Sequence, residues 1–210
     1  MTITLKAGST VMFTGDSITD CQRLGLAGEN PLGYGYPLRV AGDWGFRHPE
    51  RPVTWLNTGI AGNKVMDLEP RWEEDVLSTH PDVVSILVGI NDVGWHSYAP
   101  DGYVIPVEDY AAGYDRLVAP LAEAGAALIL IEPFLIPLTP EQREQREDLD
   151  PKIQAVRDLA RKYDAHLLAA DGLFAQLAST TEPSYWAADG VHPTPAGHAA
   201  LAAAWLRLVE

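Results

Sequence analysis

The sequence predicts an α/β fold, namely a three-layer α/β/α sandwich around a central, mainly parallel sheet of about five strands. Short apolar runs alternate along the chain with longer segments of helical periodicity. This is the pattern of a parallel sheet whose strands are connected by crossover helices. In addition, 210 residues with 47% hydrophobic content can bury a sizeable core. We therefore expect a single domain that covers residues 1–210.

The apolar runs are the expected strands, and in chain order they cover residues 10–13, 53–56, 83–88, 126–131 and 166–170. Helical periodicity is found in residues 68–77, 110–124, 153–163 and 196–208. In the last of these segments, Leu201, Trp205 and Leu208 share one stripe, which is suited to packing on a sheet.

Residues 139–150 (TPEQREQREDLD) are densely charged. Such a run is usually the solvated face of a helix or a loop, and we expect the same here. A function as an interface or a lid is the alternative.

The composition limits the possible partners. The chain has 15 basic and 29 acidic residues, for a net charge of −14, which argues against binding to nucleic acid or to an anionic membrane. No apolar stretch approaches the roughly 20 residues of a membrane helix, and the N-terminus does not resemble a signal peptide. The one cysteine, Cys21, fits a reducing compartment. We expect a cytoplasmic protein that binds a small, neutral molecule.

Polar clusters follow three of the expected strands. Residues 15–17 follow the first strand, residues 57–63 the second and residues 89–92 the third. In open α/β sheets, binding sites form at the carboxyl ends of the strands. We therefore expect these loops to meet at one crevice, together with the loop that contains Asp189 and His192.

Asp189 and His192 have the spacing of an acid–base pair. An aspartate that binds Nδ1 of a histidine holds the ring and stabilises its charged form, and Pro193 stiffens the chain just after the histidine. Ser17, far upstream, is the candidate nucleophile for this base. The alternatives are a surface turn for Asp189–His192 and a helix N-cap for Ser17.

A serine, a histidine and an aspartate in these roles would suit acyl transfer. That reaction also requires hydrogen-bond donors for the negative oxygen that develops in the transition state. Gly62 can present a backbone N–H without a side chain, and Asn91 has a side-chain NH₂ group. A turn glycine and a turn or cap asparagine are the alternative interpretations. No His-x-x-x-His motif or Cys/His cluster is present, so we expect no metal. The phosphate-loop pattern Gly-x-x-x-x-Gly-Lys-Ser/Thr is also absent.

Four segments, GDSITD, NTGIAGN, VGINDVGW and DGVHPT, occur in this order and resemble the blocks of the SGNH hydrolases, also called GDSL esterases and lipases. The resemblance extends from residue 11 to about residue 206. It implies an SGNH/flavodoxin-like fold and a cofactor-free acyl-enzyme mechanism. In that mechanism, Ser17, His192 and Asp189 form the triad, and Ser17, Gly62 and Asn91 form the oxyanion hole.

The segments FTGDSITDCQR, PLGYGYPLRV, RWEEDVLSTHPDVVSILVGINDVGW and EPFLIP are similar to those of the bacterial acetylxylan esterases that lack a secretion signal. This narrower resemblance implies removal of O-acetyl groups from carbohydrates such as xylo-oligosaccharides, and assembly as a homo-oligomer. The six tryptophans are a second reason to expect an oligomer. One departure is Ala188, since members of that group have tryptophan immediately before the triad aspartate. A lysophospholipase or thioesterase and a non-catalytic carbohydrate-binding protein are the alternatives.

Several residues near the four segments have expected roles outside the triad. Trp95, His96 and Trp186 are candidate substrate-binding residues, with core or interface packing as the alternative for the aromatic rings. Three aspartates that flank the site are expected to make supporting hydrogen bonds, and these are Asp16, Asp20 and Asp92. Two further side chains are expected to pack rather than to react, and these are Cys21 and His198.

Overall fold

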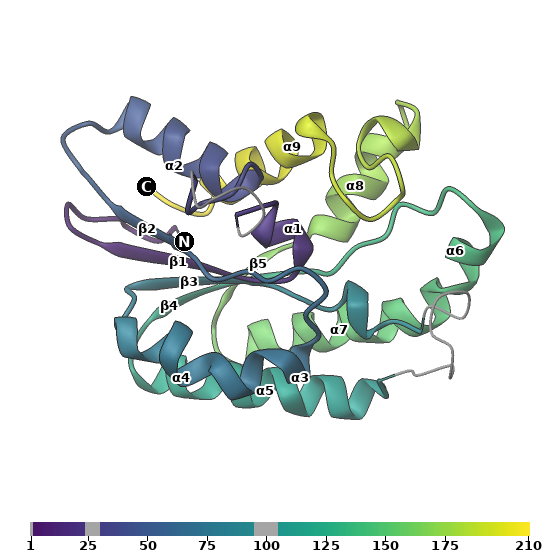
Figure 1. Cartoon of the computed structure of the whole chain (residues 1–210), viewed down its shortest axis with the longest axis horizontal. Helices are drawn as coiled ribbons and strands as arrows, with labels where there is room; N and C mark the ends of the chain where they lie inside the picture. The colour runs from purple at the N-terminus through teal and green to yellow at the C-terminus, as the bar shows by residue number, and fades with distance from the viewer. Residues whose placement is uncertain (1, 24–29, 95–104) are drawn as a thin grey trace.

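The computed structural model describes residues 2–23, 30–94 and 105–210. Five parallel strands form one sheet in the order β2-β1-β3-β4-β5 (Figure 1). Their bounds are β1 Thr10–Gly15, β2 Thr54–Asn57, β3 Val83–Leu87, β4 Ala127–Ile131 and β5 His166–Leu168. The prediction of five strands in a parallel sheet is confirmed, and the bounds differ from the expected ones by one or two residues.

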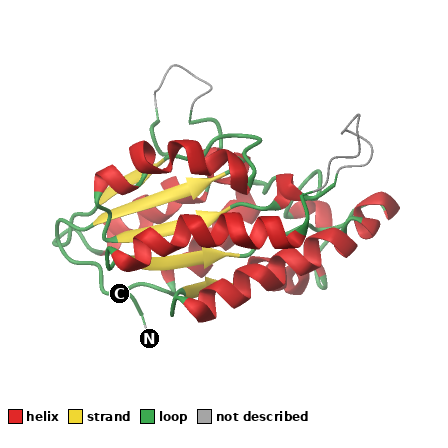
Figure 2. Ribbon diagram, turned by 90° about the horizontal axis from the view of Figure 1, so that it is seen from below, coloured by secondary structure: helices red, strands yellow, loops and turns green. Residues whose placement is uncertain are grey.

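Helices cover both faces of the sheet, which confirms the three-layer prediction (Figures 1 and 2). One face is covered by α1 (Ser17–Asp20), α2 (Tyr36–Arg47), α8 (Ala170–Ala178) and α9 (Pro195–Leu206). The other face is covered by α3 (Val65–Leu68), α4 (Trp72–Asp75), α5 (Val107–Glu123) and α7 (Arg146–Lys162). The remaining short elements are α6 (Pro140–Glu144) and the 3₁₀ turns Glu69–Arg71, Leu77–Thr79, Ile90–Asp92 and Pro183–Tyr185. None of the described helices is both long and apolar enough to span a bilayer.

The alternation of side chains along the strands produces two hydrophobic cores, one on each face of the sheet. On β1, Phe13 belongs to the core beneath α2 and α9, whereas Met12 belongs to the core beneath α5 and α7. Trp205 of α9 is fully buried, and its indole Nε1 donates to the hydroxyl of Ser85 on β3 at 3.0 Å. Leu201 and Trp205 of the predicted stripe are therefore buried in this core, and the indole N–H of Trp205 is satisfied. Leu208, the third residue of the stripe, lies beyond the end of α9 and is half-buried.

Two helices were not predicted. Helix α2 contains two glycines and has a proline in its first turn, and glycine lowers helix propensity by about 1 kcal/mol. Its stability comes instead from burial of Tyr36, Val40 and Trp44. Helix α8 begins at Ala170, so the end of the expected strand 166–170 is in fact helical.

The expected helix 68–77 is wrong as a single element. The structure has a series of short turns there, namely α3, a 3₁₀ turn, α4 and a second 3₁₀ turn. Pro70 lies in the first of the 3₁₀ turns, and because proline lacks an N–H it cannot continue the helical ladder of hydrogen bonds. This broken path places Arg71 beside the loop that follows β2.

The charged residues 139–150 are largely helical. Thr139 caps α6 by accepting a hydrogen bond from the Gln142 amide at 3.3 Å, and α7 begins at Arg146, well before the expected residue 153. Several side chains in this segment are exposed, but Leu149 is completely buried. The segment is thus a helical face, as expected, and it is also anchored in the core.

Candidate active site

The turn after β1 places Ser17 at the edge of the sheet. Gly15 has a φ of +142°, and a Cβ there would lie 1.8 Å from the carbonyl oxygen of Leu87 on β3, so only glycine fits. Asp16 then caps α1, since its Oδ1 accepts a hydrogen bond from the Ile18 amide at 3.0 Å. The N-cap is therefore Asp16 and not Ser17, which leaves the Ser17 hydroxyl available for another partner.

That partner is His192. Ser17 Oγ lies 2.9 Å from His192 Nε2, and His192 Nδ1 lies 2.7 Å from Asp189 Oδ2. A carboxylate can only accept, so Nδ1 carries the proton and Nε2 is left as the acceptor for the serine hydroxyl. The structure thus brings the three residues together in the arrangement of a nucleophile, a base and an orienting acid.

The Asp-x-x-His turn is rigidly held. Asp189 Oδ1 accepts hydrogen bonds from the backbone amides of Val191 at 2.9 Å and His192 at 2.7 Å. Gln142 of α6 donates to the carbonyl oxygen of Asp189 at 2.7 Å, and the Ile136 amide donates to the Gly190 carbonyl at 2.9 Å. The charged segment 139–150 therefore supports this loop, a role that the sequence analysis missed because one glutamine among many charges gives no signal.

These bonds also set the charge of Asp189. Partial burial disfavours its ionised form, but the hydrogen bonds from the His192 ring and from the His192 and Val191 amides outweigh that effect. The pKa of Asp189 is therefore held below its usual value. An ionised Asp189 is the form that accepts a hydrogen bond from His192 Nδ1 and stabilises a positive charge on the ring.

Two of the three expected oxyanion donors, Gly62 and Asn91, lie on the loops that follow β2 and β3. Gly62 has a φ of +84° and is exposed, and no described residue accepts a hydrogen bond from its amide. The loop is tied to the nucleophile turn by a bond from the Ile60 amide to the Gly15 carbonyl at 3.0 Å. Asn91 lies in the 3₁₀ turn Ile90–Asp92, and its Nδ2 donates to the Asn63 carbonyl at 3.1 Å. One of the two Asn91 side-chain N–H groups is thereby fixed.

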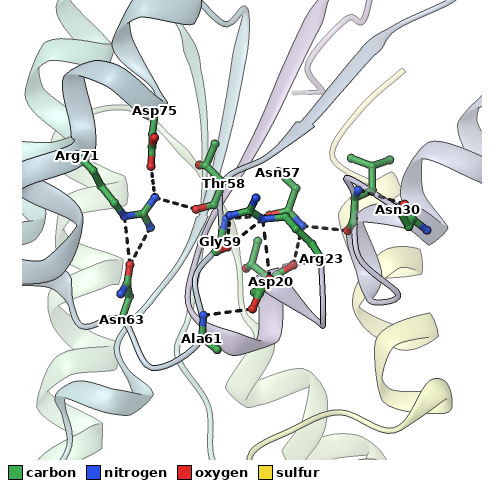
Figure 3. A network of polar contacts seen from close by, with 12 residues as sticks. Asp20, Arg23, Asn30, Asn57, Thr58, Gly59, Ala61, Asn63, Arg71 and Asp75 are labelled. Atoms are coloured by element: carbon green, nitrogen blue, oxygen red, sulfur yellow. Dashed lines mark hydrogen bonds and ion pairs between the residues drawn. The ribbon is translucent and has the colours of Figure 1, made fainter. Parts of the chain in front are cut away.

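The three flanking aspartates make the expected supporting hydrogen bonds. Besides Asp16, Asp20 accepts from the Ala61 amide at 3.3 Å (Figure 3), and Asp92 accepts from the Val65 amide at 3.1 Å. Burial raises the pKa of Asp16 to about 7, even though a backbone hydrogen bond opposes the shift. Burial likewise raises the pKa of Asp92 to about 7, against the Val65 hydrogen bond and the charge of Lys152.

A pocket of about 630 Å³ opens beside Ser17 and His192. Its wall includes the apolar side chains of Ile18, Ile60 and Pro193. Reactive groups beside an apolar concavity are the usual arrangement of a small-molecule site. In the described part of the chain, no three His, Cys, Asp or Glu side chains gather as a metal-binding group would require.

Cys21 and His198 contact each other in the wall of this pocket, and the expectation that both pack is confirmed. The backbone amide of Tyr36 donates to His198 Nδ1 at 3.2 Å, so the ring proton lies on Nε2, which is 3.5 Å from Cys21 Sγ. Burial raises the pKa of the Cys21 thiol, and a protonated thiol is a poor nucleophile.

We predict that His198 makes stability sensitive to acid. Burial, followed by the charges of Arg39 and His192, lowers the pKa of His198 from 6.5 to about 4. Between these two pH values the unfolded chain binds the proton more readily, so the stability present above pH 6.5 is lost as the pH falls towards 4. The loss is on the order of 3 kcal/mol.

Unfolding of the parent and of His198→Gln by urea at pH 4.5 and pH 7.5 measures this loss. The difference between the free energies of unfolding of the parent and of the variant is expected to shrink at pH 4.5. His80→Gln, at an exposed position, is the control. An equal pH dependence of the parent and His198→Gln would contradict the prediction.

The three candidate substrate-binding residues have different outcomes. Trp95 and His96 lie outside the described residues. Trp186 is half-buried, packs against the core that contains Trp205, and stacks edge-on against Tyr185. It is not part of the wall of the Ser17 pocket. Packing was the alternative for this ring, and its contact with substrate stays a prediction.

The chain is similar to known proteins over most of its length. Residues 13–200 match the model of the GDSL-like lipase/acylhydrolase family. An acetylxylan esterase from Geobacillus stearothermophilus is 38% identical over 210 residues, which covers 97% of this chain and 94% of that protein. The crystal structure of this kind of enzyme, Axe2 from the same organism, has a TM-score of 0.85 at 34% identity, with 97% of this chain and 94% of that chain covered.

Two further structural similarities are informative. Three solved variants of Axe2, each with alanine in place of one serine, aspartate or histidine, are described as catalytic mutants. The replaced aspartate and histidine of that enzyme are three positions apart, as are Asp189 and His192 here. A GDSL-like lipase structure from Parabacteroides merdae has a TM-score of 0.89 at 31% identity and covers 99% of this chain and 98% of that chain.

Proposed function

The chain belongs to the GDSL-like lipase/acylhydrolase family, and from this premise we propose that it is a serine esterase that removes acetyl groups from carbohydrates, with xylo-oligosaccharides as the leading substrates. The observation that carries the proposal is the chain of contacts from Ser17 Oγ to His192 and on to Asp189, at 2.9 and 2.7 Å. The similarity to an acetylxylan esterase over nearly the full length supports the substrate class.

In this proposal, the reaction has two acyl-transfer steps. His192 Nε2 takes the proton of Ser17 as Oγ attacks the ester carbonyl, and Asp189 stabilises the charged imidazole ring. The tetrahedral intermediate collapses when the ring gives the proton to the sugar oxygen of the ester. The bond between this oxygen and the acetyl carbon then breaks, so the sugar leaves as an alcohol and acetyl-Ser17 remains. Water then attacks the acetyl-Ser17 ester with His192 as base again, and acetate and free enzyme result.

The negative oxygen of the tetrahedral intermediate needs donors, and the positions of three groups suit this role. Ser17 is the first residue of α1, where a helix leaves its amide unpaired. The Gly62 amide and the second N–H of the Asn91 side chain are the other two proposed donors. Because these groups are already oriented before the substrate binds, they need little reorganisation during the reaction.

We expect the substitution Asn91→Ala to lower kcat by about 10²–10³-fold, the usual cost of losing one oxyanion donor. KM is expected to change little, because the hydrogen bond is strongest to the charged oxygen of the transition state. Steady-state hydrolysis of p-nitrophenyl acetate by the parent and the variant measures both constants. A near-normal kcat would remove Asn91 from the mechanism.

A panel of esters tests the substrate class. Acetylated xylo-oligosaccharides, acetylated monosaccharides and p-nitrophenyl esters from acetyl to octanoyl are compared by kcat/KM for the parent enzyme. We expect acetyl esters well ahead of octanoyl esters, and acetylated xylo-oligosaccharides ahead of p-nitrophenyl acetate. Octanoyl ahead of acetyl would instead support a lysophospholipase or thioesterase, whereas binding of sugar without hydrolysis would support a carbohydrate-binding protein.

The expected homo-oligomer and cytoplasmic location belong to this proposal as well. The tryptophans do not support an oligomer, because the described ones are buried or half-buried. Exposed aromatic side chains are better support, and these include Phe46, which is 85% exposed, and Tyr185. Light scattering tests the assembly, for which a monomer would be the contrary result, and cell fractionation tests the location.

A further inference from the structure

We propose that Arg71 is a positioning residue for the oxyanion hole and that it acts by clamping the loop between Thr58 and Asn63. This inference rests on the proposed function, because it concerns the donors that the esterase reaction would use. In the sequence, Asn63 is only the last residue of the polar cluster 57–63, and Arg71 is only the first residue of a segment of family resemblance, so neither has an expected role of its own. Only the fold brings the 3₁₀ turn Glu69–Arg71 against the loop that follows β2 (Figure 3).

The Arg71 guanidinium binds both ends of this loop (Figure 3). Its Nε and Nη2 donate to Asn63 Oδ1 at 3.2 and 2.8 Å, and its Nη1 donates to the Thr58 carbonyl at 2.8 Å. An ion pair with Asp75 fixes the guanidinium from the other side. The side chain is only 17% exposed, so these charge-assisted bonds are less weakened by water than those of a surface pair.

Between its two ends the loop has few other restraints near Gly62. Ala61 and Gly62 are both exposed, and the Ala61 amide is bound by Asp20. Arg23 binds the Gly59 carbonyl through two nitrogens at 3.0 and 2.7 Å, so it holds the first half of the loop. Arg71 holds the second half, where the Gly62 amide directly precedes Asn63.

Asn63 also connects the clamp to the second donor. Its backbone carbonyl accepts the hydrogen bond from Asn91 Nδ2 at 3.1 Å, while its side chain is held by Arg71. A rotation of Asn63 would therefore shift the Gly62 amide and the Asn91 amide together. A displacement of about 1 Å in such groups can cost about 10²-fold in rate.

Arginine is suited to this task and lysine is not. The planar guanidinium reaches Asn63, Thr58 and Asp75 at once from fixed directions, whereas an ammonium group is a compact charge without this fork. We therefore expect Arg71→Lys to lower kcat about tenfold and Arg71→Met to lower it about a hundredfold, with KM within about twofold of the parent value. Asn63→Ala, which removes the accepting oxygen, is expected to resemble Arg71→Lys.

The matched control is Arg116→Met. Arg116 of α5 pairs with Glu69, in the same 3₁₀ turn as Arg71, but it is 53% exposed and contacts no residue of the 58–63 loop in the described structure. Its loss is expected to leave kcat and KM unchanged. If Arg71→Met does not fold, Arg71→Lys and Asn63→Ala still test the proposal, with thermal unfolding of each variant measured alongside.

The decisive readout is a double-mutant cycle for kcat on p-nitrophenyl acetate, with Arg71→Lys and Asn91→Ala singly and together. If Arg71 positions the oxyanion donors, Arg71→Lys lowers kcat by a smaller factor in the Asn91→Ala background than in the parent. We expect the kcat of the double variant to be about fivefold higher than the value obtained by multiplying the losses of the two single variants. Strictly multiplicative losses, an unchanged kcat in Arg71→Lys, or a change in KM alone would overturn the inference. A parent without esterase activity would overturn the proposed function together with this inference, whereas an active parent with a multiplicative cycle overturns only the inference.

Discussion

Ser17→Ala is expected to lower kcat by at least about 10⁴-fold, which is the scale seen when the nucleophile of a serine hydrolase is removed. Among the described residues, this hydroxyl is the hydrogen-bond partner of His192 Nε2, at 2.9 Å. Without it, no covalent intermediate forms, and only oriented water remains for the attack. Residual activity above the uncatalysed rate is expected from the oxyanion donors.

The control for this substitution is Ser78→Ala. Ser78 is exposed, and its hydroxyl donates to the carbonyl of Glu74, far from the pocket. Both variants are expected to unfold at nearly the temperature of the parent, since neither removes buried volume. Steady-state rates on p-nitrophenyl acetate give the comparison. A Ser17→Ala enzyme within tenfold of the parent would contradict the nucleophile assignment.

Asp189→Asn is expected to lower kcat by about 10³–10⁴-fold. The amide of asparagine can donate to His192 Nδ1, which moves the ring proton to Nε2 and removes the acceptor for the Ser17 hydroxyl. It also removes the negative charge that stabilises the protonated ring. The shape of the turn should persist, because the asparagine oxygen can still accept from the Val191 and His192 amides.

The matched control is Asp109→Asn, an exposed carboxylate in the first turn of α5. It removes the same charge at a distance from the pocket and should leave kcat unchanged. The rates of both variants are measured under the conditions used for the parent. If Asp189→Asn lowers kcat by less than about tenfold, Asp189 neither sets the tautomer of His192 nor stabilises the charge of its ring to a useful extent.

The strands and the meeting of the site residues could be predicted from the sequence, because both depend on local signals. Buried parallel strands are nearly continuous apolar runs, and strand ends collect at one edge of the sheet. The turn with Asp189 and His192 was recognisable since its side chains are three positions apart and bond within the turn itself.

The supports of the site could not be predicted, because they depend on contacts between distant segments. Gln142 binds the carbonyl of Asp189 from α6, and Arg71 binds Asn63 from a turn that the periodicity presented as part of a longer helix. In each case the side chain donates a hydrogen bond to a backbone carbonyl or to a side-chain amide oxygen. Acceptors of this kind occur throughout the chain, so no local sequence pattern identifies the pair.

Helix α2 could not be predicted either, because it too depends on contacts with distant segments. Helix α2 has a weak propensity because of its glycines, and it forms because Tyr36 and Trp44 are buried beneath it. Tertiary packing supplies most of the stability of such helices. Propensity and periodicity alone therefore underestimate them.

The assignment of Ser17 as the nucleophile of an enzyme for acetylated carbohydrates is tested most directly by covalent labelling. The parent is incubated with the organophosphate diethyl p-nitrophenyl phosphate, with and without acetylated xylobiose, and the modified peptide is identified by mass spectrometry. We expect one label, on the peptide that contains Ser17, formed in proportion to the loss of esterase activity and slowed by the sugar ester. A label elsewhere, or full hydrolysis of acetylated xylobiose after complete labelling of Ser17, would contradict it.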